Sequence, residues 1–225
     1  MAASTLEARI VACRKCPRLV AHCRKVAREK RRAYLDWDYW GKPVPPFGVA
    51  QPRLFVVGLA PGAHGSNRTG RMFTGDASGD WLYRALHAAG FSTRPTATRR
   101  GDGLRLLDAR ITAAARCAPP DNKPTPRELE NCRPYLVEEL RGCRRLRVVV
   151  ALGRVGMDAF VRAWAEAGRP AFSPKPHFFH GAEAAAGAVT LLVSFHPSRQ
   201  NTQTGKLTRR MLHGVFRRAR KIISE

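Results

Sequence analysis

Residues 54–79 read LFVVGLAPGAHGSNRTGRMFTGDASG and join a short apolar run to a long glycine-rich loop. The apolar part, Leu54–Val57, is typical of a buried strand in a parallel sheet. The loop, Gly58–Gly79, precedes an amphipathic stretch, Trp81–Ala89, that predicts a helix ending at Gly90. Ligands of open α/β sheets bind outside the carboxyl ends of the strands, so chemistry is expected at this loop. An ordinary glycine-rich connection is the alternative interpretation.

Further apolar runs alternate with stretches that predict helices. The other expected strands are Ala109–Ala115, Arg147–Leu152 and Val189–Phe195. Helices are expected from the capping-box pattern Ser4–Glu7, from Thr125-Pro126, over Gly153–Ala167 and over roughly Lys206–Ile223, with Pro17 interrupting the first of them. Strands that alternate with helices predict a mostly parallel sheet covered on both faces. We expect a single domain over residues 1–225.

The composition indicates a polyanionic partner. Lys and Arg number 40 against 17 Asp and Glu, which gives a formal charge of +23. Basic side chains that neutralise phosphates release counterions and so bind nucleic acid without sequence preference. A solvated basic surface without a partner is the alternative. The sequence contains no apolar run near the roughly 20 residues that span a membrane and no secretory signal, so we expect a cytoplasmic protein.

Six cysteines in a cytoplasmic chain are expected to be reduced, which favours metal ligands or core thiols over disulfides. Four of them form two close groups: Cys13-x-x-Cys16, and Cys117 with Cys132. This spacing fits a four-thiolate site for zinc or for a [4Fe–4S] cluster, and four unrelated thiols are the alternative. Cys23 and Cys143 are expected to be structural thiols.

Several side chains that could carry chemistry follow the expected strands. Asp76 can position or deprotonate a water, and His196 can donate a hydrogen bond to charge that develops on a leaving group. Phe73 offers a flat face for a base, and Asn122 can donate to or accept from its edge. Each also has a structural interpretation: helix cap, structural histidine, core packing and turn residue, respectively. Their joint placement at the strand ends favours function.

Three motifs identify a known family. GLAPGAHGSNRTGRMFTGDASG, RCAPPDNKPTPRELENC and HPSRQNTQTG, together with Cys13-x-x-Cys16, closely resemble the iron–sulfur uracil-DNA glycosylases, and within them family 5, the type-B enzymes. The resemblance covers nearly the whole chain. It implies an α/β fold, a three-layer α/β/α sandwich with a central four-stranded, mostly parallel sheet. It also implies that Cys13, Cys16, Cys117 and Cys132 hold a structural [4Fe–4S] cluster.

The resemblance further implies that a damaged base is flipped out of DNA and cut from its sugar. We expect hydrolysis without a lyase step, which leaves an abasic site. The expected catalytic residues are Asp76, His196 and Asn122. The expected base-binding residues are Phe73, Gly58, Ala60 and Gly62. The expected DNA-binding residues are Ser198, Arg199, Gln200 and Asn201. The partner would be damaged, mainly double-stranded DNA, bound by a monomer in the bacterial nucleoid.

One departure from related families bears on specificity. Other uracil-DNA glycosylase families carry an acidic residue just after the first strand, where this chain has Leu59 and Ala60. Family 5 shares this absence. Fewer base-specific hydrogen bonds should relax discrimination, and the family accepts hypoxanthine, xanthine and ethenocytosine besides uracil.

Two other functions are alternatives. A non-enzymatic, metal-containing DNA-binding module would explain the charge and the cysteines but not the strand-end side chains. A nucleotide phosphate cradle is disfavoured, because Gly58–Gly70 lacks the G-x-x-x-x-G-K-[ST] pattern and contains no G-x-G-x-x-G.

Overall fold

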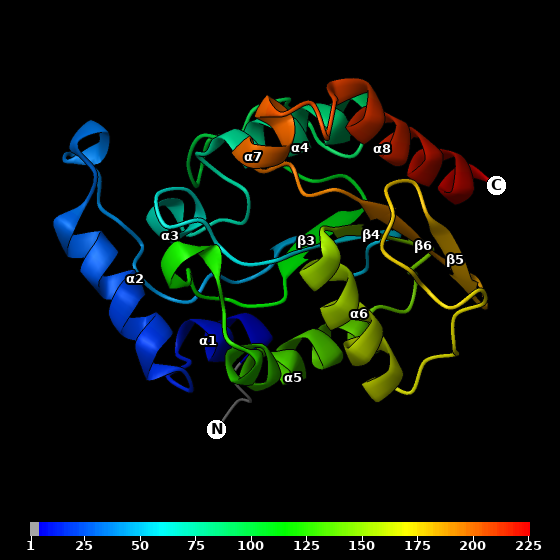
Figure 1. The fold of residues 1–225 in the computed structure, drawn as a ribbon, viewed down its shortest axis with the longest axis horizontal. Coiled ribbons are helices and arrows are strands. Elements are labelled where there is room, and N and C mark those ends of the chain that lie inside the picture. Colours follow the sequence, from blue (N-terminus) through cyan, green and yellow to red (C-terminus); the bar gives the residue numbers. More distant parts are fainter. Residues whose placement is uncertain (1–4) are drawn as a thin grey trace.

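The computed structural model describes residues 5–225, and these form a twisted sheet between two layers of helices (Figure 1). Ser4 of the expected capping box lies outside the described residues. Thr5 is the N-cap of the first helix, α1 (Leu6–Val11), and its Oγ1 accepts from the Ala8 N–H at 3.2 Å. A helix therefore opens the described chain, as expected, but its N-cap is Thr5, one residue after the start of the predicted capping box.

Four parallel strands form the centre of the sheet and confirm the predicted fold class. In the order β3-β2-β4-β6 they are Ala109–Ala113, Leu54–Gly58, Val148–Leu152 and Val189–Ser194. Each lies within a residue or two of its predicted bounds. Two short antiparallel strands extend the edges: β1 (Phe47–Gly48) beside β3, and β5 (Glu183–Ala186) beside β6. They were not predicted, because two residues and an EAAA segment carry no clear strand pattern.

Residues of the central strands alternate between two cores. Leu54 and Val56 pack on one face of the sheet with α4 and α8, whereas Phe55 and Val57 pack on the other with α5 and α6. Figure 1 shows the two layers on opposite faces of the sheet. The bounds are Ala77–Ala88 for α4, Pro126–Gly142 for α5, Arg154–Glu166 for α6 and Arg209–Ser224 for α8.

The remaining helices lie in the N-terminal segment and in the loops that follow strands. Pro17 opens α2 (Pro17–Glu29), so the first helical stretch is interrupted as predicted. The shorter helices are η1 (Arg32–Tyr34), α3 (Ser66–Thr69), η2 (Pro120–Asn122) and α7 (Arg199–Gln203). No helix among residues 5–225 is long and apolar enough to cross a membrane.

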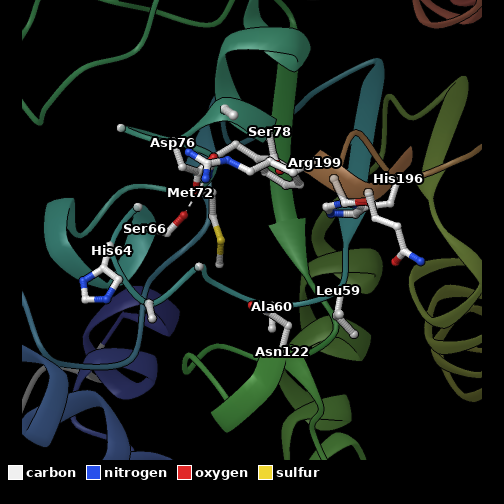
Figure 2. A pocket seen from close by; sticks show the side chains of 18 of the residues that line it. Leu59, Ala60, His64, Ser66, Met72, Asp76, Ser78, Asn122, His196 and Arg199 are labelled. Atoms are coloured by element: carbon white, nitrogen blue, oxygen red, sulfur yellow. Dashed lines mark hydrogen bonds between the residues drawn. The ribbon is translucent and has the colours of Figure 1, made fainter. Parts of the chain in front are cut away.

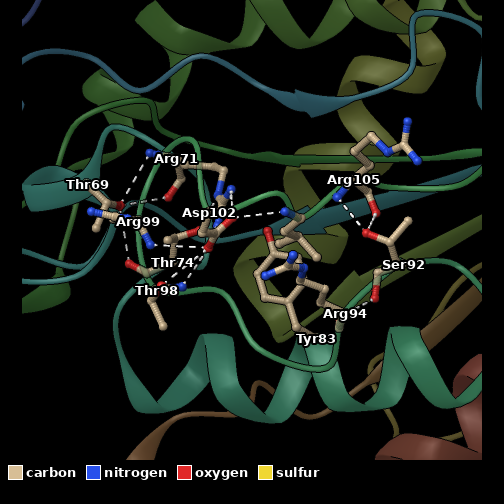
Figure 3. A network of polar contacts seen from close by, with 12 residues as sticks. Thr69, Arg71, Thr74, Tyr83, Ser92, Arg94, Thr98, Arg99, Asp102 and Arg105 are labelled. Atoms are coloured by element: carbon tan, nitrogen blue, oxygen red, sulfur yellow. Dashed lines mark hydrogen bonds and ion pairs between the residues drawn. The ribbon is translucent and has the colours of Figure 1, made fainter.

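A buried ion pair between Arg71 and Asp102 holds the glycine-rich loop in place (Figure 3). Arg71 donates to both carboxylate oxygens of Asp102 at 2.8 and 2.6 Å, and its Nε donates to Thr74 Oγ1 at 2.9 Å. Asp102 also accepts from backbone N–H groups, among them that of Leu104 at 3.0 Å. Burial raises the pKa of Asp102, but these hydrogen bonds outweigh it and hold the pKa well below its usual range. The segment that leads to Asp76 is thus fixed by a charged anchor.

Candidate active site

A cavity of about 600 Å³ lies at the carboxyl edge of the sheet, where the loops after β2 and β6 meet η2. Figure 2 shows Asp76 and His196 approaching it from two different loops, with Asn122 near Ala60. The expected catalytic residues Asp76, His196 and Asn122 all line it, as does Phe73. Segments far apart in the sequence therefore share one cavity.

Asp76 is both a helix cap and a cavity residue. Its Oδ1 accepts from the Gly79 N–H at 2.9 Å, which starts α4 before the predicted Trp81. Its Oδ2 faces Gly65, where a Cβ atom would lie only 1.9 Å away. Desolvation raises the pKa of Asp76, and the Gly79 hydrogen bond opposes part of that rise. The two interpretations of this residue are thus compatible.

Phe73 is held in an unusual backbone conformation. Its φ is +52°, a value uncommon for residues with a side chain, and its N–H donates to Ser66 Oγ at 2.9 Å. The ring covers Gly58, where a Cβ would lie 2.7 Å from Phe73 Cζ. Gly58 therefore supports the ring from below, while Ala60 and Gly62 line the cavity itself.

His196 follows β6 and presents an unpaired imidazole. The Asn201 amide donates to the His196 carbonyl at 2.8 Å and fixes its backbone. Neither ring nitrogen has a hydrogen-bond partner in the part of the chain that the structure describes. Desolvation lowers the pKa of His196 to about 4, so the ring is neutral at pH 7. It can therefore donate a hydrogen bond without carrying charge.

Asn122 stands on the exposed rim of the cavity. It and Asp121 have positive φ values of +56° and +52° within η2. Asn and Asp adopt this left-handed conformation more readily than other residues with side chains, and they do so mostly in turns. Asn122 is therefore a turn residue that also lines the cavity.

The expected DNA-binding residues divide into two kinds. Arg199 and Gln200 are exposed and line the mouth of the cavity. Ser198 caps α7, since its Oγ accepts from the Asn201 N–H at 3.3 Å. The Asn201 side chain is turned inward to His196. Ser198 and Asn201 thus hold the short segment from which Arg199 and Gln200 project.

Sequence reasoning missed the opposite wall of the cavity, formed by Arg31, Tyr34, His64 and Ser66. Arg68 supports it from behind: its Nε donates to the His64 carbonyl at 2.7 Å and its Nη2 to the Gly75 carbonyl at 2.8 Å. The guanidinium lies 3.9 Å from the Tyr34 ring centre and 4.0 Å from that of Trp37. Two aromatic residues three apart in a basic segment were the available signal.

The four cysteines line one narrow cavity, although the two groups lie far apart in the chain. Cys13 lies between α1 and α2, Cys16 is the N-cap of α2, Cys117 follows β3 and Cys132 lies in α5. Asn131 Nδ2 lies 3.5 Å from Cys16 Sγ. Among residues 5–225 no group of three or more potential ligands is arranged closely enough to define a metal site. The thiols are gathered, but geometry alone does not establish a metal centre.

The two remaining cysteines are buried. Cys23 Sγ lies 3.7 Å from the Ala118 carbonyl oxygen, beside the Cys117 thiol. Cys143 ends α5 in the core shared with α6. Burial raises the pKa of the Cys143 thiol to about 11, so it stays protonated. Both are placed as structural thiols would be.

Comparison with known proteins gives one consistent result. The family model described as "Uracil DNA glycosylase superfamily" matches residues 45–220. A "Type-5 uracil-DNA glycosylase" of Mycobacterium leprae is 50% identical over 221 residues, covering 96% of this chain and 94% of the relative. A protein of the same name from Thermus thermophilus is 50% identical over 214 residues, covering 95% and 94%. A "Type-4 uracil-DNA glycosylase" of Pyrobaculum aerophilum is 30% identical, covering 80% of each chain. This chain belongs to the uracil-DNA glycosylase superfamily.

Proposed function

We propose that this protein is a DNA glycosylase that releases uracil from DNA by hydrolysing the N-glycosidic bond, leaving an abasic site. The observation that carries the proposal is the convergence of Asp76, Phe73 and His196 on one cavity. Relatives at about 50% identity over nearly the full chain carry the name uracil-DNA glycosylase.

Asp76 supplies the negative charge at the sugar. Breaking a glycosidic bond generates an oxocarbenium-like transition state, which a nearby carboxylate stabilises. One oxygen of Asp76 is held by the Gly79 N–H, and the other faces the small residues of the loop. The carboxylate can therefore orient the attacking water while it remains fixed.

His196 supplies a hydrogen bond to the departing base. Negative charge develops on the base as the bond breaks, and a preorganised donor lowers the barrier. A neutral imidazole suits this role because it needs no counter-ion in a desolvated pocket. Asn122, on the facing rim, hydrogen-bonds the base or positions the water.

Phe73 stacks on a base that has been flipped out of the duplex. Gly58 leaves room for the Phe73 ring, and Ala60 and Gly62 on the cavity wall leave room for the base. Leu59 and Ala60 line the cavity and place no charge there. A volume of about 600 Å³ also admits bases with two fused rings, so the substrates extend to hypoxanthine, xanthine and ethenocytosine.

DNA approaches over the segment that follows His196. Arg199 and Gln200 contact the duplex, while Ser198 and Asn201 hold their short helix in place. No lysine is among the described residues that line the cavity, which favours hydrolysis without a Schiff base. The protein acts as a monomer on mainly double-stranded DNA.

Cys13, Cys16, Cys117 and Cys132 hold a [4Fe–4S] cluster in this proposal. Four thiolates on one cavity suit iron–sulfur ligation, although the donor set also fits zinc. The cluster would link the N-terminal helices to α5 and takes no part in bond cleavage. A visible absorption spectrum separates a brown iron–sulfur protein from a colourless zinc protein.

The central experiment incubates the purified protein with a duplex that contains one uracil, then cleaves abasic sites with alkali. Strand scission by the wild type and its loss in Asp76→Ala, with duplex binding retained, would support the proposal. Binding without scission would instead indicate the non-enzymatic DNA-binding module. A panel of duplexes with hypoxanthine, xanthine or ethenocytosine then tests the breadth of the substrate range.

A further inference from the structure

Arg116 is buried beside the four-cysteine cavity. It directly precedes Cys117, is 1% exposed, and lines the cavity with all four thiols. A fully buried guanidinium is costly unless negative charge and hydrogen-bond acceptors surround it. Its partners therefore indicate what this position is built for.

The known partners satisfy only part of the guanidinium. Nη1 donates to Thr112 Oγ1 and Nη2 donates to the Glu139 carboxylate. The third guanidinium nitrogen, Nε, is buried without a partner among the described residues. Buried polar groups in folded proteins are nearly always paired, so an orphaned N–H next to a cavity indicates an acceptor in that cavity.

The charges around Arg116 also indicate a negative partner in the cavity. Glu139 is shared, because Arg110 Nε also donates to it at 3.1 Å. Arg110 has a second carboxylate, Glu7, at 2.7 Å, but the Glu7 side chain is 46% exposed. Arg110 is thus paired with two carboxylates, whereas Arg116 has only the shared Glu139. A cluster held by four thiolates is net negative and would give Arg116 a second negative neighbour.

We propose that Arg116 is the buried counter-charge of the four-cysteine site and that its Nε–H donates to a sulfur there. The proposal rests on the proposed function only in taking the site to hold an iron–sulfur cluster. Net charge and hydrogen bonds to sulfur set the properties of such clusters. Arg116 would therefore stabilise the bound cluster and would act from outside its ligand set.

Three variants separate this role from general destabilisation. Arg116→Gln removes the charge, while Glu139 keeps Arg110 and Thr112 as partners. Arg116→Lys keeps the charge but loses the Nε donor. Arg110→Gln is the matched control: it removes an equal charge from the same carboxylate, and Arg110 does not line the cysteine cavity. Should Arg116→Gln fail to fold, the double variant Arg116→Gln/Glu139→Gln removes both members of the Arg116–Glu139 ion pair, and Arg110 keeps Glu7 as its partner.

The measurements are iron and sulfide content, the Fe–S stretching bands by resonance Raman, and the rate at which a chelator bleaches the visible absorption. We expect shifted bands and about tenfold faster bleaching in Arg116→Gln, as is usual for groups that support metal ligands. Arg116→Lys should show shifted bands with an intermediate rate, and Arg110→Gln should match the wild type in both.

Unchanged bands and bleaching in Arg116→Gln would overturn the proposal, as would equal effects of Arg110→Gln. A wild-type protein without iron and sulfide would overturn it too. Release of uracil by the wild type, assayed in parallel, tests the proposed function separately. The two ideas can therefore fail independently.

Discussion

The rings of Phe73 and His196 lie with their centroids 5.8 Å apart and their planes tilted by 32°. Phe73 belongs to the loop after β2 and His196 follows β6, and β4 separates these two strands in the sheet. Because parallel strands end at one edge, the two loops meet there. In the proposed mechanism a base stacked on Phe73 would lie beside the imidazole, so that one arrangement would serve both base binding and leaving-group stabilisation.

Replacing His196 with alanine should slow base release by roughly 10²-fold or more, because a preorganised donor to the leaving base is lost. Binding of the duplex should change little. The measurement is the single-turnover rate on a uracil duplex with enzyme in excess. His213→Ala is a suitable control, since desolvation also lowers the pKa of His213 but it does not line the cavity. An unchanged rate in His196→Ala would remove this residue from the mechanism.

The rate of base release should fall as the pH falls. The fall should begin at a higher pH than it would for an aspartate with an ordinary pKa. Asp76 must be ionised to stabilise the cation, and desolvation raises its pKa, so its protonation begins earlier on the way down. His196, with a pKa of about 4, stays neutral over most of this range. Single-turnover rates between about pH 4.5 and 8 measure this limb. If Asp76→Asn still lost rate at low pH in the same way, the titrating group would be a residue other than Asp76.

Gly65→Ala should lower base release while the fold is kept. The new Cβ would lie 1.9 Å from Asp76 Oδ2, so the carboxylate must move. A displacement of about 1 Å can cost 10²-fold in rate. Gly142→Ala is the control, because no atom lies within 4 Å of a Cβ there. Equal rates for both variants would show that the exact position of the carboxylate is unimportant.

The central strands and the strand-end residues were predictable because each carries a local signal. The run Leu54–Val57 is apolar throughout, as a strand buried on both faces requires. Proline is best tolerated in the first turn of a helix, so Pro17 alone made a helix break after Cys16 predictable. Asp76 shows the limit of local reasoning: capping and catalysis use the same side chain, and sequence alone could not reveal that both apply.

The remaining parts depend on tertiary contacts. Strands β1 and β5 form because a neighbouring strand offers hydrogen bonds, and segments this short carry no pattern from which that pairing could be predicted. Arg68 reads as one more basic residue in a basic chain, yet it is 3% exposed and joins the His64 and Gly75 carbonyls. Its role follows from where the aromatic rings of Tyr34 and Trp37 lie.

Asp102→Asn should lower the free energy of unfolding by about 3 kcal/mol, because Arg71 would remain buried without its carboxylate. The Arg71 and Asp102 side chains are only 6% and 11% exposed. Urea denaturation of both proteins at pH 7 measures the difference. Asp158→Asn, at an exposed position on α6, is the control and should leave stability unchanged.

The same pair gives a pH dependence with a definite sign. The pKa of Asp102 lies below its usual range in the folded protein, so the unfolded chain takes up its proton first as the pH falls. The stabilisation by Asp102 is therefore complete above the ordinary aspartate pKa and is lost at lower pH. The difference in free energy of unfolding between wild type and Asp102→Asn should narrow in that lower range. Arg71 also donates to Thr74, two residues before Asp76. Loss of the Asp102 carboxylate should loosen this segment, so Asp102→Asn should also release uracil more slowly. A stability gap that widens in acid would contradict the assignment of this stabilisation to the Asp102 carboxylate.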